Sequence, residues 1–430
     1  MARFIYTLAV FALLPWAVLH LLWRARRQPE YLRHWGERFG MFGAASSAPS
    51  HQGIPLRITI WLHAVSVGET RAAQPLVAAL RERYPGYRIL FTHMTPTGRA
   101  TSDALFGDGV ERIYLPYDTP GAMRRFLRHY RPQFGLIMET ELWPNLIAAC
   151  RQEKVPLRLV NARLSQRSAR RYAMFPALTR EALHGLAAIG AQSADDAMRL
   201  EALGARNITV TGNIKFDIEA PEQQLSLGRE LRLRYGNRPV WLAASTREGE
   251  ETLILDAWKR ANVRVGAGET ALLVVVPRHP QRFDEVSRLA AERGFVVQRR
   301  SEDAPVAPAT QVLIGDSMGE MFAYYASVDL AFIGGSLLDF GSQNLIEAAA
   351  CGTPVLIGPS TRNFAEAARA ALACGAARSV VDAEDLVSQV LGLLGNEAER
   401  TAIGQAGREF AARHRGATAR TMELLSRAAR

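Results

Sequence analysis

The sequence has 430 residues, of which 48% are hydrophobic and 22% are charged, and it carries a formal net charge of +10. This composition excludes a largely disordered chain, and the length predicts two domains. The three cysteines, Cys150, Cys351 and Cys374, have no CxxC spacing, so neither a disulfide framework nor a cysteine zinc site is expected and a reducing compartment is indicated.

The first predicted element is an apolar segment at the N-terminus. Residues 4–23 carry no formal charge, and about 20 such residues suffice to cross a bilayer. Arg3 precedes the segment and three arginines follow it within residues 24–27, and the more basic side normally stays in the cytoplasm. We therefore expect residues 1–27 to form a single-pass anchor in the inner membrane, with the rest of the chain in the cytoplasm.

A cleaved signal peptide and a buried helix are the alternatives for this segment. The apolar part of a signal peptide has about 7 to 15 residues and ends at a site of small residues. Here the apolar run is longer, and the small residues 44–48 lie beyond a further charged segment at residues 33–38. A retained anchor is therefore the preferred interpretation.

Short β-rich runs alternate with helical patterns from residue 57 onward, which predicts βαβ units and a parallel sheet. The stretch at residues 43–53 is rich in Pro, Ser and Gly and separates this series from the anchor. The first series of expected strands comprises residues 57–62, 88–92, 112–115, 134–139, 157–161, 187–191 and 208–211.

A polar segment without apolar periodicity begins at Asp217 and predicts a linker. Beyond residue 398 the chain reads as one or two basic helices that cover a sheet. The fold class is thus α/β, with an anchor at 1–27, a Rossmann-like domain at 28–217, a linker at 218–226 and a second Rossmann-like domain at 227–430. The strands expected in the second domain are residues 240–244, 271–276, 295–298, 312–314, 330–333 and 354–357.

Several familiar sites lack their sequence motifs. There is no GxGxxG after a first strand and no GxxxxGK[ST], so dinucleotide binding and P-loop chemistry are not expected. The nine histidines show no metal-ligand spacing, and no HExxH or EF-hand loop occurs, so no metal is expected.

The positive charge favours an anionic partner, but no nucleic-acid-binding motif accompanies it. The densest basic patch comprises Arg163, Arg167 and Arg170, whose spacing places them on one helical face. Such a face suits phosphates of a substrate or an anionic membrane surface, and it suits a solvated surface equally well.

One acidic residue stands out in the first domain. Glu69 follows a predicted strand and a glycine-containing turn, at the carboxyl edge of the sheet where ligands bind in open α/β folds. A lone carboxylate there suits a general base. It also suits a helix-capping acid, because Glu69 begins a predicted helix and acids are favoured at that position.

The motifs extend in order over nearly the whole chain. The first half contains His63-Ala-Val-Ser-Val-Gly-Glu69, Met94-Thr-Pro-Thr-Gly98, Met138-Glu-Thr-Glu-Leu-Trp-Pro-Asn145, Asn161-Ala-Arg-Leu-Ser-Gln-Arg-Ser168 and Gly212-Asn-Ile-Lys-Phe-Asp217. The second half contains Ala244-Ser-Thr, Val276-Pro-Arg-His-Pro280, Gly315-Asp-Ser-Met-Gly-Glu320, Phe332-Ile-Gly-Gly-Ser336, Asn344-Leu-Ile-Glu347 and Gly358-Pro. Together they resemble the 3-deoxy-D-manno-oct-2-ulosonic acid (Kdo) transferases.

The resemblance implies a GT-B glycosyltransferase with the acceptor in the first domain and the sugar nucleotide in the second. Members of the family move Kdo from CMP-Kdo to the lipid A precursor at the cytoplasmic face of the inner membrane. The implied partners are therefore CMP-Kdo, which is a co-substrate rather than a cofactor, the lipid A precursor and the anionic membrane surface, with no nucleic acid.

The resemblance also implies roles for single residues. Glu69 matches the base, and Glu139 and Lys215 match positions that stabilise the transition state. Without the resemblance, Glu139 would suit a structural ion pair and Lys215 a surface position. The CMP contacts of the family fall on Pro277, Arg278, Met318, Gly319, Glu320, Asn344, Leu345, Ile346 and Glu347.

Four positions depart from the family pattern. Arg247, Gln343 and Ser360 stand where histidine is usual, and His93 stands where threonine is frequent. The departures leave the expected base and CMP contacts in place, and Arg247 is a candidate for an anion contact.

Two other functions are compatible with parts of the sequence. A different GT-B enzyme, such as a nucleotide-sugar epimerase, would share much of the second-half pattern, but the anchor and the set Glu69, Glu139 and Lys215 argue against it. A non-catalytic membrane scaffold would explain the anchor and the positive charge, but it gives no reason for the nucleotide motifs.

Overall fold

The computed structural model describes residues 1–26, 28–43, 58–217, 219–261 and 270–427. Most of the expected spacer at 43–53 and the small residues 44–48 lie outside these residues. The chain divides into two compact units, of which the first comprises Met1–Asp217 with Arg415–Arg430 and the second comprises Ile218–His414. Each unit is an α/β domain with its own parallel sheet, so the predicted fold class is confirmed.

The sheet of the first unit has seven strands in the order β3-β2-β1-β4-β5-β6-β7, and every neighbouring pair is parallel. The strands are β1 (Thr59–His63), β2 (Arg88–His93), β3 (Glu111–Tyr114), β4 (Pro132–Met138), β5 (Leu157–Ala162), β6 (Ala188–Ala191) and β7 (Ile208–Val210). The principal helices are α1 (Ala2–Ala25), α2 (Val67–Ala72), α3 (Gln74–Arg83), α4 (Pro96–Phe106), α5 (Pro120–Tyr130), α6 (Pro144–Gln152), α7 (Gln166–Ala173), α8 (Pro176–Leu183), α9 (Ala194–Ala202) and α18 (Ala417–Arg427).

The sheet of the second unit also has seven strands, in the order β10-β11-β9-β8-β12-β13-β14, again with parallel pairs. The strands are β8 (Val240–Thr246), β9 (Leu272–Pro277), β10 (Val297–Arg299), β11 (Val312–Ile314), β12 (Leu330–Ile333), β13 (Val355–Ile357) and β14 (Ala377–Ser379). The helices are α10 (Glu222–Tyr235), α11 (Glu250–Arg260), α12 (Phe283–Glu292), α13 (Met321–Ser327), α14 (Ile346–Cys351), α15 (Ala365–Ala373), α16 (Ala383–Leu394) and α17 (Glu397–His414).

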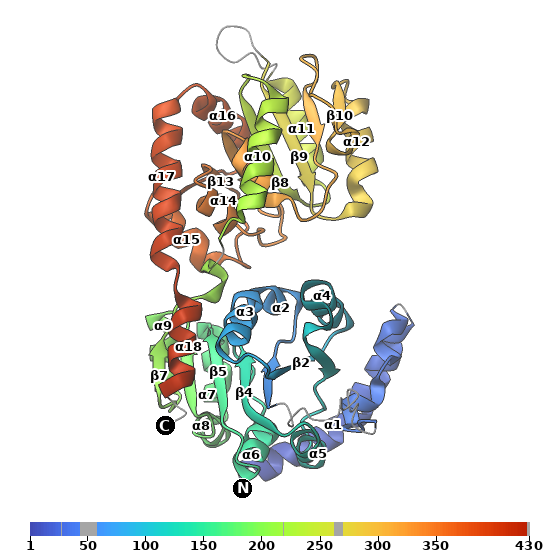
Figure 1. Cartoon of the computed structure of the whole chain (residues 1–430), viewed down its shortest axis with the longest axis vertical. Helices are drawn as coiled ribbons and strands as arrows, with labels where there is room; N and C mark the ends of the chain where they lie inside the picture. Colours follow the sequence, from blue (N-terminus) through green and yellow to red (C-terminus); the bar gives the residue numbers. More distant parts are fainter. Residues whose placement is uncertain (27, 44–57, 218, 262–269, 428–430) are drawn as a thin grey trace. The chain divides into compact units, whose positions relative to one another are not determined.

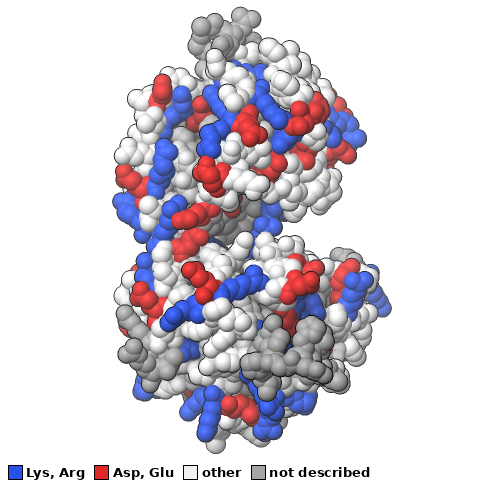
Figure 2. Space-filling view, viewed as in Figure 1, with Lys and Arg blue, Asp and Glu red and all other residues white. Residues whose placement is uncertain are grey.

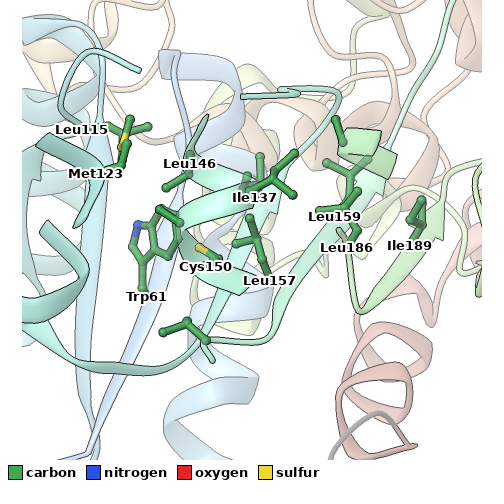
Figure 3. Close-up of a cluster of buried hydrophobic side chains, with 14 of the residues drawn as sticks. Trp61, Leu115, Met123, Ile137, Leu146, Cys150, Leu157, Leu159, Leu186 and Ile189 are labelled. Carbon is green, nitrogen blue, oxygen red and sulfur yellow. The ribbon is translucent and has the colours of Figure 1, made fainter. Parts of the chain in front are cut away.

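The central strands are apolar on both faces because helices cover both sides of a parallel sheet. In β1, Trp61 belongs to one buried cluster, while Ile60 and Leu62 belong to the cluster on the opposite face. Figure 3 shows the first cluster, in which Trp61 and Ile137 of the sheet lie near Leu146 of α6. Because successive side chains of a strand point to opposite faces, this sheet has a hydrophobic core on each face.

The C-terminal helix corrects the expected domain boundary. The sequence assigned all residues up to 430 to the second domain, whereas α18 packs on α3 and β6 of the first unit. The Asp217 carboxylate accepts hydrogen bonds from the main-chain N–H groups of Gly416 (2.6 Å), Ala417 (3.2 Å) and Thr418. An acid at the N-terminus of a helix is favourable. Leu425 of α18 is buried in the first unit.

Two further differences concern short segments. Helix α10 begins at Glu222, inside the segment expected to be a linker. Strand β14 was not predicted, because its three residues Ala377–Ser379 include Arg and Ser and show no apolar run.

Among the described helices, α1 is the one that is long and apolar enough to cross a membrane. It covers the apolar segment that the sequence predicted to be an anchor. Little of it is buried by the protein, since 6% of its most apolar window lies inside the structure. This observation excludes the alternative of a buried core helix.

Candidate active site

The catalytic candidates of the first unit lie where its strand order changes direction. The chain runs from β1 to β2 and β3 on one side of the sheet, and from β4 to β7 on the other. Ligands of open α/β sheets bind at the carboxyl ends of the strands at such a switch point. Glu69 follows β1 at the start of α2, and Glu139 directly follows β4, so the two acids flank this point.

Glu69 is held by its own loop. Its Oε2 accepts a hydrogen bond of 2.8 Å from the Val65 N–H, and its Oε1 accepts one of 2.8 Å from the Ser66 hydroxyl. The Ser66 hydroxyl oxygen in turn accepts from the Glu69 N–H at 3.3 Å, which caps the start of α2. The structural interpretation of Glu69 as a capping acid is therefore correct, but it leaves lone pairs on both carboxylate oxygens for a proton.

The surroundings of Glu69 make its carboxylate more basic than usual. Burial raises the pKa of Glu69, and the nearby charge of Glu139 raises it further. The hydrogen bond from Val65 and the positive charge of Lys215 act in the opposite direction. The charges of Glu139 and Lys215 therefore both lie close enough to Glu69 to shift its pKa.

Glu139 and Lys215 form an ion pair. The Lys215 Nζ lies 3.0 Å from the Glu139 Oε1, and about a quarter of each side chain is exposed, 24% for Lys215 and 25% for Glu139. The pair is therefore accessible to a ligand. Glu139 has a φ of 55°, a left-handed backbone that non-glycine residues rarely adopt and that is found often at functional sites.

The end of β5 positions Lys215. The Asn161 side-chain oxygen accepts a hydrogen bond of 3.0 Å from the Ile214 N–H, and the Asn213 side-chain oxygen accepts one of 3.0 Å from the Lys215 N–H. Both asparagines belong to motifs noted in the sequence. They fix the short turn that carries the lysine.

Glu141 is a further acid of this cluster that the sequence did not single out. Its pKa is raised to about 7, first by burial and then by the charge of Glu69, while the Trp143 side chain lowers it. The signal that could have found it is its place in the Met138-Glu-Thr-Glu motif, two residues after Glu139. Three carboxyl groups and one lysine thus meet at the switch point.

Two histidines are buried beneath the same edge of the sheet. The pKa of His63 is lowered to about 4 by burial, and that of His93 is lowered to about 3 by burial and by the neighbouring His63. The His63 Nδ1 lies at a hydrogen-bonding distance of 2.8 Å from the Thr92 hydroxyl oxygen. The His93 Nδ1 lies 3.1 Å from the Ala64 carbonyl oxygen. His93, one of the departures from the family pattern, is thus a buried supporting residue.

These histidines predict a loss of stability in acid. Between pH 6.5 and about 4 the unfolded chain binds more protons at both positions than the folded chain, so these two positions lower the free energy of unfolding as the pH falls. We expect each histidine to contribute a loss of about 2 kcal/mol between pH 7 and pH 5, whereas Glu141, whose pKa is raised, contributes in the opposite direction. In urea unfolding, the change in free energy between these two pH values should therefore differ by about 2 kcal/mol between His93→Gln and the wild type, with the exposed His184→Gln as control; an equal change in His93→Gln and the wild type would contradict the assignment.

The nucleotide candidates of the second unit also gather at the carboxyl edge of their sheet. Pro277 ends β9, Glu320 lies in the segment that follows β11, and Asn344 lies in the segment that follows β12. Because the sheet is parallel, these three segments reach the same edge. The switch point of this sheet lies between β8 and β12.

The individual side chains differ in what they offer to a ligand. The side chains of Leu345 and Ile346 are buried in the core, so these two residues can contact a ligand only through their main-chain atoms. Asn344 accepts from the Ile346 N–H at 3.0 Å and donates to Glu347 at 3.1 Å. Glu320 accepts a hydrogen bond of 2.6 Å from Ser317.

The remaining candidates lie beside these segments. Gly319 has a φ of +81°, which explains the choice of glycine, and Met318 is exposed. Arg278 follows β9 and donates its main-chain N–H to the Thr246 carbonyl at 3.0 Å. This bond ties the β9 end to the β8 end.

Glu250 is a buried residue of this site that sequence reasoning missed. Its carboxylate accepts from the main-chain N–H groups of Arg247 (2.9 Å), Gly335 (2.6 Å) and Leu337 (2.9 Å). Burial raises its pKa, although these three hydrogen bonds lower it. Glu250 therefore joins the loop after β8 to the loop after β12; like Glu69, it is an acid that starts a helix after a strand, and that pattern could have revealed it.

The other departures from the family pattern have structural contacts. The Arg247 guanidinium lies 4.6 Å from the centre of the Phe340 ring. The Ser360 hydroxyl oxygen accepts from the Gly341 N–H at 3.0 Å. Gly334 approaches the end of β8 so closely that a Cβ there would lie 2.7 Å from the Ser245 carbonyl oxygen, and the side chain of Gln343 lies next to Gly335.

The basic face of the first unit is exposed. Arg163, Arg167 and Arg170 are all exposed, and α7 buries none of its residues. Arg163 precedes α7, so the three arginines do not share one helical face as the spacing predicted. On the face of the molecule shown in Figure 2, basic and acidic side chains alternate rather than gather by sign. The exposure leaves these arginines available to solvent or to an anion.

Comparison with known proteins identifies relatives over the whole chain. Residues 33–218 match the family described as 3-deoxy-D-manno-octulosonic-acid transferase (kdotransferase), and residues 317–426 match a glycosyl transferase-like family. The 3-deoxy-D-manno-octulosonic acid transferase of Bordetella pertussis is 46% identical over 99% of both chains. That of Haemophilus influenzae is 37% identical over 99% of this chain and 98% of the relative.

Solved structures share the fold at low identity. A putative UDP-N-acetylglucosamine 2-epimerase from Listeria monocytogenes is 16% identical, with a TM-score of 0.55 over 86% of this chain and 96% of that one. The UDP-GlcNAc 2-epimerase from Neisseria meningitidis is 15% identical, with a TM-score of 0.54 over 86% of this chain and 100% of the other. These likenesses confirm the GT-B-like architecture.

Proposed function

Since the chain belongs to the 3-deoxy-D-manno-octulosonic acid (Kdo) transferase family, we propose that this glycosyltransferase moves Kdo from CMP-Kdo to the lipid A precursor, lipid IVA. The product enters lipopolysaccharide core biosynthesis. The observation that carries the proposal is the meeting of Glu69 with the Glu139–Lys215 ion pair at the switch point of the first unit.

Glu69 is the general base of the proposed reaction. A sugar hydroxyl is a weak nucleophile, and a carboxylate that accepts its proton as the new bond forms accelerates transfer by about 100- to 10,000-fold. The raised pKa of Glu69 supports this role, because a stronger base takes the proton more readily. The acceptor oxygen attacks the anomeric carbon of Kdo, the bond from that carbon to the CMP phosphate oxygen breaks, and the configuration inverts in one displacement.

Glu139 and Lys215 stabilise the transition state. The anomeric carbon becomes partly cationic as CMP leaves, and a fixed carboxylate near it lowers the barrier. The leaving phosphate gains negative charge, which suits a lysine such as Lys215. CMP is a competent leaving group, so this chemistry requires neither a cofactor nor a metal ion.

The second unit binds CMP-Kdo. The cationic side chain of Arg278 suits the phosphate, and the carboxylate of Glu347 suits the ribose hydroxyls. The carboxyl edge of the parallel sheet supports this placement, because it is the usual ligand edge of the fold. The full set proposed for CMP is Pro277, Arg278, Met318, Gly319, Glu320, Asn344, Leu345, Ile346 and Glu347.

Helix α1 attaches the enzyme to the inner membrane, with both units in the cytoplasm. Its apolar composition supports attachment to a membrane, and the basic residues after it suit the anionic cytoplasmic surface. The acceptor is a membrane lipid, so attachment confines the enzyme to the surface that holds its substrate.

The direct test is transfer by the purified protein. We expect incubation with CMP-Kdo and a tetra-acylated lipid A precursor to yield the precursor with one or more added Kdo units, identified by mass spectrometry. Replacement of CMP-Kdo by a UDP-hexosamine is the donor control. Unchanged precursor after incubation with CMP-Kdo would contradict the proposal.

A further inference from the structure

Helix α1 contacts the first unit through polar side chains in its first two turns. The Tyr6 hydroxyl donates a hydrogen bond of 2.9 Å to the Asp118 carboxylate, and the Thr7 hydroxyl donates one of 2.9 Å to the Asn145 side-chain oxygen. In the first turn, Arg3 forms an ion pair of 3.2 Å with Glu181 of α8. The N-terminus of the chain accordingly lies beside α6 (Figure 1).

The partners of these contacts are fixed parts of the unit. Asp118 and Asn145 are each 3% exposed. The Asp118 carboxylate also accepts from the N–H groups of Asn145 (3.0 Å) and Leu146 (2.7 Å), so it caps the start of α6. Tyr6 thus completes a buried capping site, and a buried carboxylate that loses a hydrogen-bond donor is destabilised.

The other end of α1 packs on the short helix that follows it in the chain. Leu21 and Ala25 are buried with Tyr31, which lies in the short helix after α1, and the Arg24 guanidinium lies 4.5 Å from the centre of the Tyr31 ring. From Arg3 to Arg24 the helix rises about 32 Å, which matches the hydrocarbon thickness of a bilayer of about 30 Å. A spanning helix would carry Arg3, Tyr6 and Thr7 to the side of the membrane opposite Arg24, away from Glu181, Asp118 and Asn145.

The remaining surface of α1 is apolar and uncovered. Phe4, Leu8, Trp16 and Leu19 are 67%, 53%, 64% and 65% exposed, and Trp23 lies on the same helix next to the basic end. Tryptophan prefers the membrane–water interface, and arginine pairs with lipid phosphates. This chemistry fits the surface of an anionic bilayer.

We infer that α1 does not cross the bilayer but lies within one leaflet along the first unit, held by Arg3, Tyr6 and Thr7 with its apolar face in the lipid. The expected single-pass anchor is replaced by an in-plane one. The node of Tyr6, Asp118 and Asn145 also joins this lipid-embedded helix to α6, whose preceding segment carries Glu139 and Glu141.

The side of the membrane on which the N-terminus lies tests this placement. Ala2→Cys and, as reference, the exposed Asp108→Cys of the first unit are expressed in the full chain and treated with a membrane-impermeant maleimide in spheroplasts and in inverted inner-membrane vesicles. Mass spectrometry separates each new cysteine from Cys150, Cys351 and Cys374. We expect residues 2 and 108 to be labelled from the same side; labelling of residue 2 from the opposite side, or after detergent alone, would overturn the inference.

The polar contacts have their own test. Tyr6→Phe combined with Thr7→Val removes both hydroxyls, and we expect hydrogen exchange at the start of α6 to rise at least tenfold, while the exposed-face control Ile5→Val leaves it unchanged. Unchanged exchange in the double variant would contradict the contacts. Flotation with vesicles of phosphatidylethanolamine and phosphatidylglycerol identifies lipid as the occupant, and a dimer that does not float would overturn that assignment.

These measurements do not require turnover. A chain that fails to transfer Kdo can still be labelled and floated, and a transferase with a spanning helix would still give product. Failure of the proposed function and failure of the in-plane placement are therefore distinguishable.

Discussion

Glu69→Gln should lower the rate of Kdo transfer by about 100- to 10,000-fold while CMP binding stays at its wild-type affinity. Glutamine keeps the size of the side chain, and the Ser66 hydroxyl can still accept from the main-chain N–H of residue 69, so α2 should remain capped. What the variant loses is the negative charge that accepts the acceptor proton. Turnover is measured with CMP-Kdo and the lipid A precursor, and CMP binding is measured by calorimetry.

The same substitution separates the two roles of Glu69. If capping were its whole contribution, Glu69→Gln would keep near-native turnover and Glu69→Ala would lose about 0.5–2 kcal/mol of stability together with activity. Glu82→Gln, on the exposed face of α3, is the control for loss of one negative charge in the same unit. Near-native turnover of Glu69→Gln would remove Glu69 from the chemistry.

The pH profile should report the same group. A general base must be deprotonated, so the acid limb of kcat/KM falls as the pH falls through the pKa of Glu69. Burial and Glu139 raise that pKa, so we expect the limb at a higher pH than for an ordinary glutamate. The neighbouring Glu141, with a pKa of about 7, should broaden the limb because the two carboxyl groups interact.

Glu250→Ala should weaken CMP binding at least tenfold. The substitution leaves the main-chain N–H groups of Arg247, Gly335 and Leu337 without their acceptor, and each buried donor left in this way costs about 1–3 kcal/mol. A local loss of about 3 kcal/mol corresponds to hydrogen exchange about 100-fold faster in the loop that follows β12. Calorimetry with CMP and hydrogen-exchange mass spectrometry measure the two effects.

Glu248→Ala is the matched control for Glu250. It removes an acid two residues earlier in the same loop, where the side chain is exposed. We expect wild-type CMP affinity and wild-type exchange from this variant. If Glu250→Ala behaved in the same way, the two loops would not depend on Glu250 for their arrangement.

The strands were the most predictable part of the fold. Apolar runs such as those of β4, β9 and β12 are buried on both faces, so their composition alone marks them. Glu69 was also within reach of sequence reasoning, because its hydrogen bonds with Ser66 join residues only three apart in the sequence. Its catalytic interpretation, by contrast, depended on a resemblance to known transferases.

Long-range partners were not predictable. Gly335 is 85 residues from Glu250, Asp118 is 112 residues from Tyr6, and Gly416 is 199 residues from Asp217. No periodicity connects such positions. Each acid had an ordinary local environment in the sequence, and its role became visible when the fold brought main-chain N–H groups or a hydroxyl to it.

The sequence by itself determined the two α/β domains, the apolar first helix and the family to which the chain belongs, because local periodicity and contiguous motifs encode them. The tertiary structure decided that α18 completes the first unit, that Glu250 joins two loops and that the first turns of α1 bind to Asp118, Asn145 and Glu181 of the same unit. The physical reason is that the spacing of apolar residues along a strand or a helix is a local property of the chain. The satisfaction of a buried carboxylate is a property of the whole fold, since its donors come from wherever the backbone returns.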